Sequence, residues 1–298
     1  MRNLALLQHK FKKLLSDKSI KHVVFDTNNS EVTYAITTEK ILKLNLNQLT
    51  VDVIGELNGS DIVSIEHLSL NDELCFATRS GEIKVQPVGN YRAESKEAES
   101  VAYVDGGTIV QMAWSPDQEI VVLVTDTKSL IVMDSTFSTI MENNLADNEF
   151  GDQAFINVGW GAKETQFHGS EGKAAAKQKN EIPTNVDIDE LDKTVSVCWR
   201  GDSDYFVVSF VSKDIGREFK VFDKTGRLQF TSEKTVGLEA PINWRPSGSW
   251  IAVPQVLPNK YIIALFEKNG LKHREIPLPF QANSVRAQQS FYKMSSKI

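Results

Sequence analysis

The sequence IVQMAWSPDQEIVVLVTDTKSLIVMD, residues 109–134, alternates apolar runs with short polar breaks. A run that ends at Trp114 is followed by a Ser-Pro-Asp turn, a β-branched run, a second polar break and another apolar run. Apolar, β-branched runs of this length between turn residues are typical of β-strands. We therefore predict strand, turn, strand, turn, strand over these residues.

The same pattern returns along the chain. Residues 195–223 (VSVCWRGDSDYFVVSFVSKDIGREFKVFD) and 240–266 (APINWRPSGSWIAVPQVLPNKYIIALF) each place a tryptophan before a turn and a following strand. The residues that occupy this aligned position, which we call the blade-core anchors, are Phe25, Leu68, Trp114, Trp160, Trp199 and Trp244. They recur at intervals of roughly 45 residues, a period typical of repeats with about four strands in each copy. Trp160 fills the middle of what would otherwise be a double interval.

A repeat of this length predicts an all-β fold, a WD-repeat-type β-propeller in which each copy forms one blade. Six blade positions are recognisable, and the fourth is degenerate because its β pattern stops soon after Trp160. We expect the propeller to cover residues 1–280, with a loop at 162–192 in the degenerate blade and a divergent tail at 281–298. One or two β-sandwiches are the alternative, but their strands would not repeat at this period.

Composition narrows the classes of partner. The chain has 298 residues, a net charge of −6 and a pI near 5.5. Phosphate binding needs a concentrated basic surface, so we expect no direct binding of nucleic acid or of an acidic membrane. The apolar runs are too short to span a bilayer, and the N-terminus lacks the pattern of a signal peptide. Cys75 and Cys198 lie in apolar runs without a Cys/His cluster, which predicts buried, reduced thiols and no structural zinc.

The sequence holds no recognisable catalytic motif. Residues 169–173 (GSEGK) look like a phosphate loop, but Phe167 stands where its first glycine should be and Ala174 where the magnesium-binding hydroxyl should be. A lone histidine is more often a surface or hydrogen-bonded residue than a catalyst. The histidines are scattered singly, at His9, His22, His67, His168 and His273. We therefore predict no catalytic, cofactor-binding or metal-binding residue.

The strongest candidate for function is the segment at residues 159–172 (GWGAKETQFHGSEG), which interrupts the regular repeat with specific polar and aromatic residues. Loops on rigid scaffolds are where binding sites collect. The candidate partner-contact residues are Lys163, Glu164, Gln166, His168 and Glu171. The alternative is that these side chains cap a broken blade internally. Acidic clusters at residues 147–152 and 187–192 are either solvated loops or a docking site for a basic partner.

Several stretches are similar to a known family. They are MRNL at the start, FINVGWGAKETQFHGSEGK at 155–173, WRGDSDYF at 199–206, FKVFDKTGRLQFTSE at 219–233, GLEAPINWRPSGSWIA at 237–252 and FEKNGLKHREIPLPF at 266–280. In these residues the chain resembles the N-terminal WD-repeat propeller of the largest subunit of the Elongator complex, the IKAP family. The stretch at 155–173 is specific, because generic WD repeats contain nothing like it.

The resemblance implies a non-catalytic scaffold. Elongator modifies the wobble uridine of certain tRNAs with a 5-carboxymethyl-type group, and the chemistry belongs to a radical-SAM and acetyl-CoA subunit with an iron–sulfur cluster. The resemblance implies that this chain assembles with that catalytic subunit and with a second WD-repeat subunit, and that it carries no cofactor of its own. It implies a cytoplasmic location, with the nucleus as a second compartment.

Two further expectations concern the ring and the competing functions. The strand expected at residues 3–8 would normally complete the last blade, and an incomplete ring would leave two blade faces uncovered, which predicts marginal stability or association.

A WD-repeat adaptor of another multiprotein complex is the main alternative function. A propeller enzyme, such as a hydrolase that uses its central channel, is the third; it would need Asp, Glu or His residues that converge at one mouth.

Overall fold

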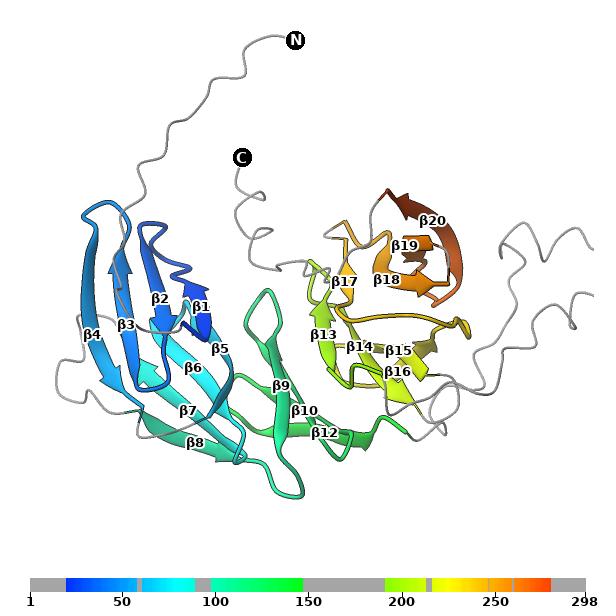
Figure 1. The fold of residues 1–298 in the computed structure, drawn as a ribbon. Helices are drawn as coiled ribbons and strands as arrows, with labels where there is room; N and C mark the ends of the chain where they lie inside the picture. The colour runs from blue at the N-terminus through cyan, green and yellow to red at the C-terminus, as the bar shows by residue number, and fades with distance from the viewer. Residues whose placement is uncertain are drawn as a thin grey trace, which may run out of the picture. The chain divides into compact units, whose positions relative to one another are not determined.

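Five four-stranded antiparallel sheets make up the regular secondary structure of the described residues (Figure 1). The computed structural model describes residues 20–57, 61–88, 98–146, 191–212, 216–245, 247–258 and 260–279. Neighbouring strands in each sheet are consecutive in sequence, as in the blades of a propeller. The chain divides into two compact units, Met1–Tyr103 with two sheets and Val104–Ile298 with three. The all-β, propeller-type architecture predicted from the repeats is confirmed.

The described residues of the first unit form two blades. One consists of β1 (His22–Phe25), β2 (Val32–Ile36), β3 (Lys40–Asn45) and β4 (Thr50–Glu56). The other consists of β5 (Ile62–Leu68), β6 (Glu73–Thr78), β7 (Glu82–Pro87) and β8 (Glu99–Tyr103). β1 and β2 are each a short, largely apolar run between turn residues.

The described residues of the second unit form three blades. Their strands are β9 (Ile109–Trp114), β10 (Ile120–Thr125), β11 (Ser129–Asp134) and β12 (Thr139–Asn144); β13 (Ser196–Trp199), β14 (Tyr205–Ser212), β15 (Gly216–Asp223) and β16 (Leu228–Thr231); and β17 (Asn243–Trp244), β18 (Ile251–Leu257), β19 (Lys260–Phe266) and β20 (Lys272–Leu278). The three strands predicted over residues 109–134 are confirmed as β9, β10 and β11.

One turn recurs between the first and second strands of successive blades. Asp72, Gln118, Ser203 and Gly248 each have a positive φ, between 54° and 76°, at the same place in this turn. In the last three, the amide of that residue donates to the carbonyl three residues earlier, at 2.8–3.1 Å. The repeat seen in the sequence is therefore also a repeat of backbone conformation.

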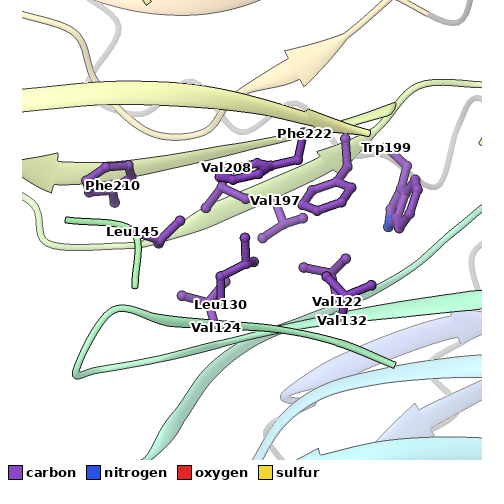
Figure 2. Packing of buried hydrophobic residues seen from close by; sticks show 11 residues of the cluster. Val122, Val124, Leu130, Val132, Leu145, Val197, Trp199, Val208, Phe210 and Phe222 are labelled. Atoms are coloured by element: carbon purple, nitrogen blue, oxygen red, sulfur yellow. The ribbon is translucent and has the colours of Figure 1, made fainter. Parts of the chain in front are cut away.

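The blades of each unit pack face to face through apolar clusters. In the first unit, Tyr34 and Ile36 of β2 pack with Leu74 and Phe76 of β6. In the second unit, Figure 2 shows the corresponding cluster between two blades, with Val122 and Leu130 opposite Val208 and Phe210. A further cluster joins β13–β16 to β17–β20 and includes Trp244 and Phe266. A fully buried side chain of this kind stabilises the fold by roughly 1.5–3 kcal/mol.

The blade-core anchors divide into buried and exposed residues. Leu68, Trp114, Trp199 and Trp244 are buried. Phe25 is not: it is 41% exposed, whereas its neighbour Val24 is buried in the first unit's cluster. Successive side chains on a strand point to opposite faces, so a shift of one residue moves an apolar side chain out of the core. The expectation for Phe25 is corrected on this ground, and Trp160 lies outside the described residues.

The position expected for a fourth blade, around Trp160, does not separate its neighbours. The β9–β12 and β13–β16 blades share one apolar cluster, and the indole Nε1 of Trp199 donates to the carbonyl of Ala113 at 3.1 Å. No blade lies between these two sheets in the described part of the chain. A long connection between adjacent blades produces the same double interval in sequence as a degenerate blade.

The remaining expectations concern the cysteines, membrane-spanning helices and the segments outside the regular blades. Cys75 and Cys198 are buried free thiols, as predicted. Within the described ranges, no helix is long and apolar enough to cross a membrane. The strand expected at residues 3–8 and the tail at 281–298 lie outside the described residues, as does almost all of the loop at 162–192.

Candidate functional site

The predicted partner-contact residues Lys163, Glu164, Gln166, His168 and Glu171 lie outside the described residues. The structure does describe the two places where their segment joins the blades. Residues 145–146 follow β12, and residues 191–194 precede β13. We call these two short pieces together the stem of the segment 147–190.

The departing side of the stem is held by a lysine. Leu145 is buried in the cluster between the two blades, and its amide donates to the carbonyl of Lys128 at 2.8 Å. Its own carbonyl accepts a hydrogen bond from Lys220 Nζ at 2.7 Å. Lys220 is only 2% exposed, and its ammonium lies 5.8 Å from the centre of the Phe210 ring. A buried cation is tolerated only where such partners replace water, so Lys220 and Leu145 depend on each other.

The returning side of the stem is held by an arginine. Arg217 Nη1 donates to the carbonyl of Thr194 at 2.8 Å and to Ser209 Oγ at 3.2 Å, and Nη2 donates to the carbonyl of Asp192. Burial lowers the pKa of Arg217, and the nearby carboxylates of Asp192 and Glu239 oppose that shift. Several N–H groups in one plane allow a single side chain to bind several carbonyls.

Asp192 belongs to the acidic cluster at 187–192, for which the sequence leaves two alternatives. Its Oδ1 accepts hydrogen bonds from the amide of Thr194 at 2.9 Å and from the Thr194 hydroxyl at 2.5 Å. The hydroxyl hydrogen bond from Thr194 lowers the pKa of Asp192 and keeps the carboxylate ionised. This carboxylate therefore stabilises the returning side of the stem. Residues 187–190 lie outside the described residues.

A second polar cluster lies in the first unit, around His67. His67 is fully buried, stacks on Tyr34 with 5.6 Å between ring centres, and accepts the backbone N–H of Thr27 at Nδ1 (3.1 Å). The Thr27 hydroxyl lies 2.8 Å from the same nitrogen, and Nε2 lies 3.0 Å from Asp72 Oδ1. A hydroxyl, an imidazole and a carboxylate in sequence is the arrangement that activates nucleophiles in hydrolases. The sequence alone shows His67 only as an isolated residue.

The hydrogen bonds of this cluster favour a structural role over catalysis. The amide of Thr27 occupies the lone pair of Nδ1, so this nitrogen is poorly placed to take a proton from the Thr27 hydroxyl. The ring is also closed off from solvent. We interpret the cluster as a structural one, whose hydrogen bonds connect the turn after β1 to β5.

The hydrogen bond that His67 Nδ1 accepts also argues against a metal ion at this cluster. Asp26, His67 and Asp72 place one ligand atom each within 4.8 Å of one another, close enough to share a cation. Because Nδ1 accepts from Thr27, Nε2 carries the proton and has no lone pair to offer. Asp26 is also engaged, since it accepts hydrogen bonds from the Tyr34 hydroxyl at 3.0 Å and from the amides that follow it. These residues do not fit a metal site.

Comparison with known proteins identifies the family. The chain matches the family model described as the ELP1 first N-terminal beta-propeller over residues 1–298. The chain belongs to this family. It is 47% identical to Elongator complex protein 1 of Drosophila melanogaster over 254 residues, which is 84% of this chain and 20% of that protein. Elongator complex protein 1 of Mus musculus is 36% identical over 258 residues, 86% of this chain and 19% of that protein.

A more distant ELP1 relative matches a similar share of this chain. Elongator complex protein 1 of Saccharomyces cerevisiae is 30% identical over 312 residues, which is 88% of this chain and 23% of that protein. The chain therefore spans about a fifth of the length of the curated ELP1 proteins it matches.

Sequence reasoning did not find the two residues of this ELP1 propeller that hold the stem. Arg217 and Lys220 stand in GREFKVFD, the sequence of β15, which also carries Glu218 and Asp223. The signal that could have revealed Lys220 is a basic residue on the same strand face as Phe222, which is buried in the cluster between the two blades.

Proposed function

We propose that this chain is the scaffold propeller of an Elongator largest subunit and that it supports the 5-carboxymethyl-type modification of wobble uridine in tRNA. The proposal rests on membership of the ELP1 propeller family and on relatives named Elongator complex protein 1. The chain itself is non-catalytic and carries no cofactor in this proposal. Its partners are the catalytic radical-SAM subunit, which performs the chemistry, and the second WD-repeat subunit.

The direct packing of the two blades that precede and follow residues 147–190 supports the choice of contact residues within this segment. The alternative role for Lys163, Glu164, Gln166, His168 and Glu171 was to cap a broken blade. Among the described residues, the β9–β12 and β13–β16 blades pack on each other through a shared cluster, which favours partner contact over internal capping. Binding residues occur disproportionately in the segments that connect the elements of a rigid scaffold. We propose these five residues as partner contacts.

Charge supports protein partners over nucleic acid in this part of Elongator. The net charge is −6, and the two basic side chains at the stem are buried and bind backbone carbonyls. Neither adds to a basic surface that would attract phosphates. The proposed place of action is the cytoplasm, with the nucleus as a second compartment.

The test is to replace residues 147–190 with a short Gly/Ser linker in the tagged chain and to measure recovery of the catalytic radical-SAM subunit by affinity purification and mass spectrometry. We expect the variant to fold, because the described residues of the two blades pack directly on each other, and to lose that subunit. The matched control replaces residues 89–97, between β7 and β8, with a similar linker and should retain it. Full recovery after replacement of 147–190, or collapse of the fold, would overturn the proposal.

A further inference from the structure

We propose that this chain associates head to tail, with the end face of the last described blade, β17–β20, docked on the end face of the first blade, β1–β4, of a second copy. The end face of each of these blades is the sheet face opposite the apolar cluster that joins the blade to its neighbour within its own unit. The proposed contact lies between separate molecules, and it is independent of the proposed function.

The strands of the last described blade are apolar on both faces. On the face that packs on β13–β16, Ile251, Val253 and Phe266 are fully buried. The side chains that alternate with them form cross-strand rows on the end face: Ala252 with Leu265, Pro254 with Ile263 and Ile276, and Val256 with Tyr261 and Leu278. Val256 and Ile276 are exposed. An antiparallel sheet with one solvated face usually alternates apolar with polar side chains, so the apolar rows indicate that a second surface covers this face.

The end face of the first blade has the same character. Its side chains form two cross-strand rows: Val23, Ala35, Leu42 and Val53, and Phe25, Thr33, Leu44 and Val51. Ala35, Leu42 and Leu44 form an apolar cluster separate from the one that joins this blade to β5–β8. Val23 and Val53, at the two ends of the first row, are exposed. Exposed apolar side chains around such a cluster are typical of an interaction site.

The described blade junctions indicate which face fits which. The blade β13–β16 presents Phe206 and Val208 to the preceding blade and Val207 and Val221 to the following one. Each of these junctions therefore joins the following face of one blade to the preceding face of the next. The end face of the last described blade is a following face, and that of the first blade is a preceding face. A head-to-tail contact between two copies thus repeats the kind of junction that the fold already uses.

Charge favours this pairing over contact between two like faces. Residues 243–278, which span β17–β20, contain five Lys and Arg but two Asp and Glu, whereas residues 22–56, which span β1–β4, contain two Lys and five Asp and Glu. Arg274 is exposed on the basic blade, and Glu56 is exposed on the acidic one. Head-to-tail contact brings opposite charges together, whereas contact between two first blades or two last blades opposes like charges.

The experiment uses two variants that each place a lysine on one end face, Val53→Lys and Ile276→Lys. Both residues are exposed and lie on the last strand of their sheet, β4 or β20 (Figure 1). Sedimentation velocity should show that the purified parent chain associates as its concentration rises. Each variant alone should raise the dissociation constant roughly tenfold or more, because its lysine is buried in an apolar contact.

The decisive measurement is an equimolar mixture of the two variants, with a fluorescent label on one of them. Ile276→Lys keeps an intact first blade, and Val53→Lys keeps an intact last blade. The mixture should therefore form a complex of one molecule of each at concentrations where each variant alone is monomeric. The matched control is Ile140→Lys, which should associate as the parent does. Ile140 has the same 45% exposure as Ile276 and also lies on the last strand of its sheet, β12, but on neither end face.

Four results would overturn the proposal. They are a parent chain that stays monomeric, a mixture that stays monomeric, equal dissociation by Ile140→Lys, and loss of association in Val53→Lys but not in Ile276→Lys, which would indicate contact between two first blades. Thermal unfolding midpoints establish that each variant folds. If Ile276→Lys does not fold, Arg274→Glu takes its place, because Arg274 is exposed on the end face and its reversal opposes the charge of the acidic blade.

Discussion

At the scale of single residues, the charged groups beside the stem make stability depend on pH. Glu239 is half-buried; burial raises its pKa, Asp192 adds to the rise and Arg217 opposes it. A carboxyl whose pKa is higher in the folded state binds its proton more tightly there than in the unfolded chain. Its effect on stability is therefore most favourable below the unfolded pKa and is lost as pH rises through the folded pKa.

Glu239→Gln should remove this dependence. We expect the variant to be more stable than the parent at neutral pH and to lose less stability between acidic and neutral pH. Urea unfolding at a series of pH values measures both effects. Glu119→Gln, in the exposed turn before β10, is the control and should leave the slope unchanged. An unchanged slope in Glu239→Gln would show that its carboxyl is not the group responsible.

The residue scale also shows where sequence reasoning stops. The buried Trp114, Trp199 and Trp244 could be predicted, because a large apolar side chain in a strand pattern needs a core wherever it stands. Arg217 and Lys220 could not. Their burial depends on carbonyls of Leu145 and Thr194, which are far away in sequence and are brought close only by the fold.

At the scale of elements, the recurring turn gives a prediction about backbone conformation. Gly248 has a φ of +76°, and a Cβ at this position would lie 2.9 Å from Cδ of Arg200. Gln118 holds the equivalent turn position with a φ of 62° despite its side chain. The left-handed conformation costs an L-residue roughly 1–2 kcal/mol.

Gly248→Ala should therefore destabilise the protein by about 1–2 kcal/mol. Gln118→Gly should be neutral or stabilise it by up to about 1 kcal/mol, since relief of the left-handed conformation is partly offset by the entropy of glycine in the unfolded chain. Chemical denaturation of the two variants checks the pair. Effects of the same sign and size would mean that the two turns do not share one conformational constraint.

Elements were the most predictable level of this fold. The strands over 109–134 are local in origin, since each is an apolar run that its own turn residues end. The number of blades, by contrast, depends on contacts between segments that are distant in sequence. A double interval between Trp114 and Trp199 fits either a degenerate blade or a long connection, and only the shared cluster of their blades decides between them. The prediction that Phe25 is buried was wrong for a related reason. The repeat period identifies the strand but not which of two adjacent residues faces inward.

At the scale of the whole molecule, apolar side chains are exposed at the two edges of one face of the first blade. On the first blade, the face opposite the first unit's cluster carries the cross-strand row Val23, Ala35, Leu42 and Val53. Ala35 and Leu42 are buried in the middle of the face, whereas Val23 is 51% and Val53 55% exposed. Phe25 lies on the same face, two residues after Val23. Exposed apolar side chains that gather at the edges of one face can mark a site of association.

We therefore expect the isolated chain to self-associate through this face. Val53→Lys places a charge at its edge and should shift the chain toward monomer without loss of stability, because Val53 is on the outermost strand and mostly in water. The control is Leu70→Lys: Leu70 is 93% exposed but lies in the turn between β5 and β6, away from the face. Sedimentation velocity over a range of concentrations measures the effect. If Leu70→Lys dissociates the chain as well as Val53→Lys does, general solubility explains the change; if the parent chain is monomeric throughout, the face is covered in solution and the expectation is wrong.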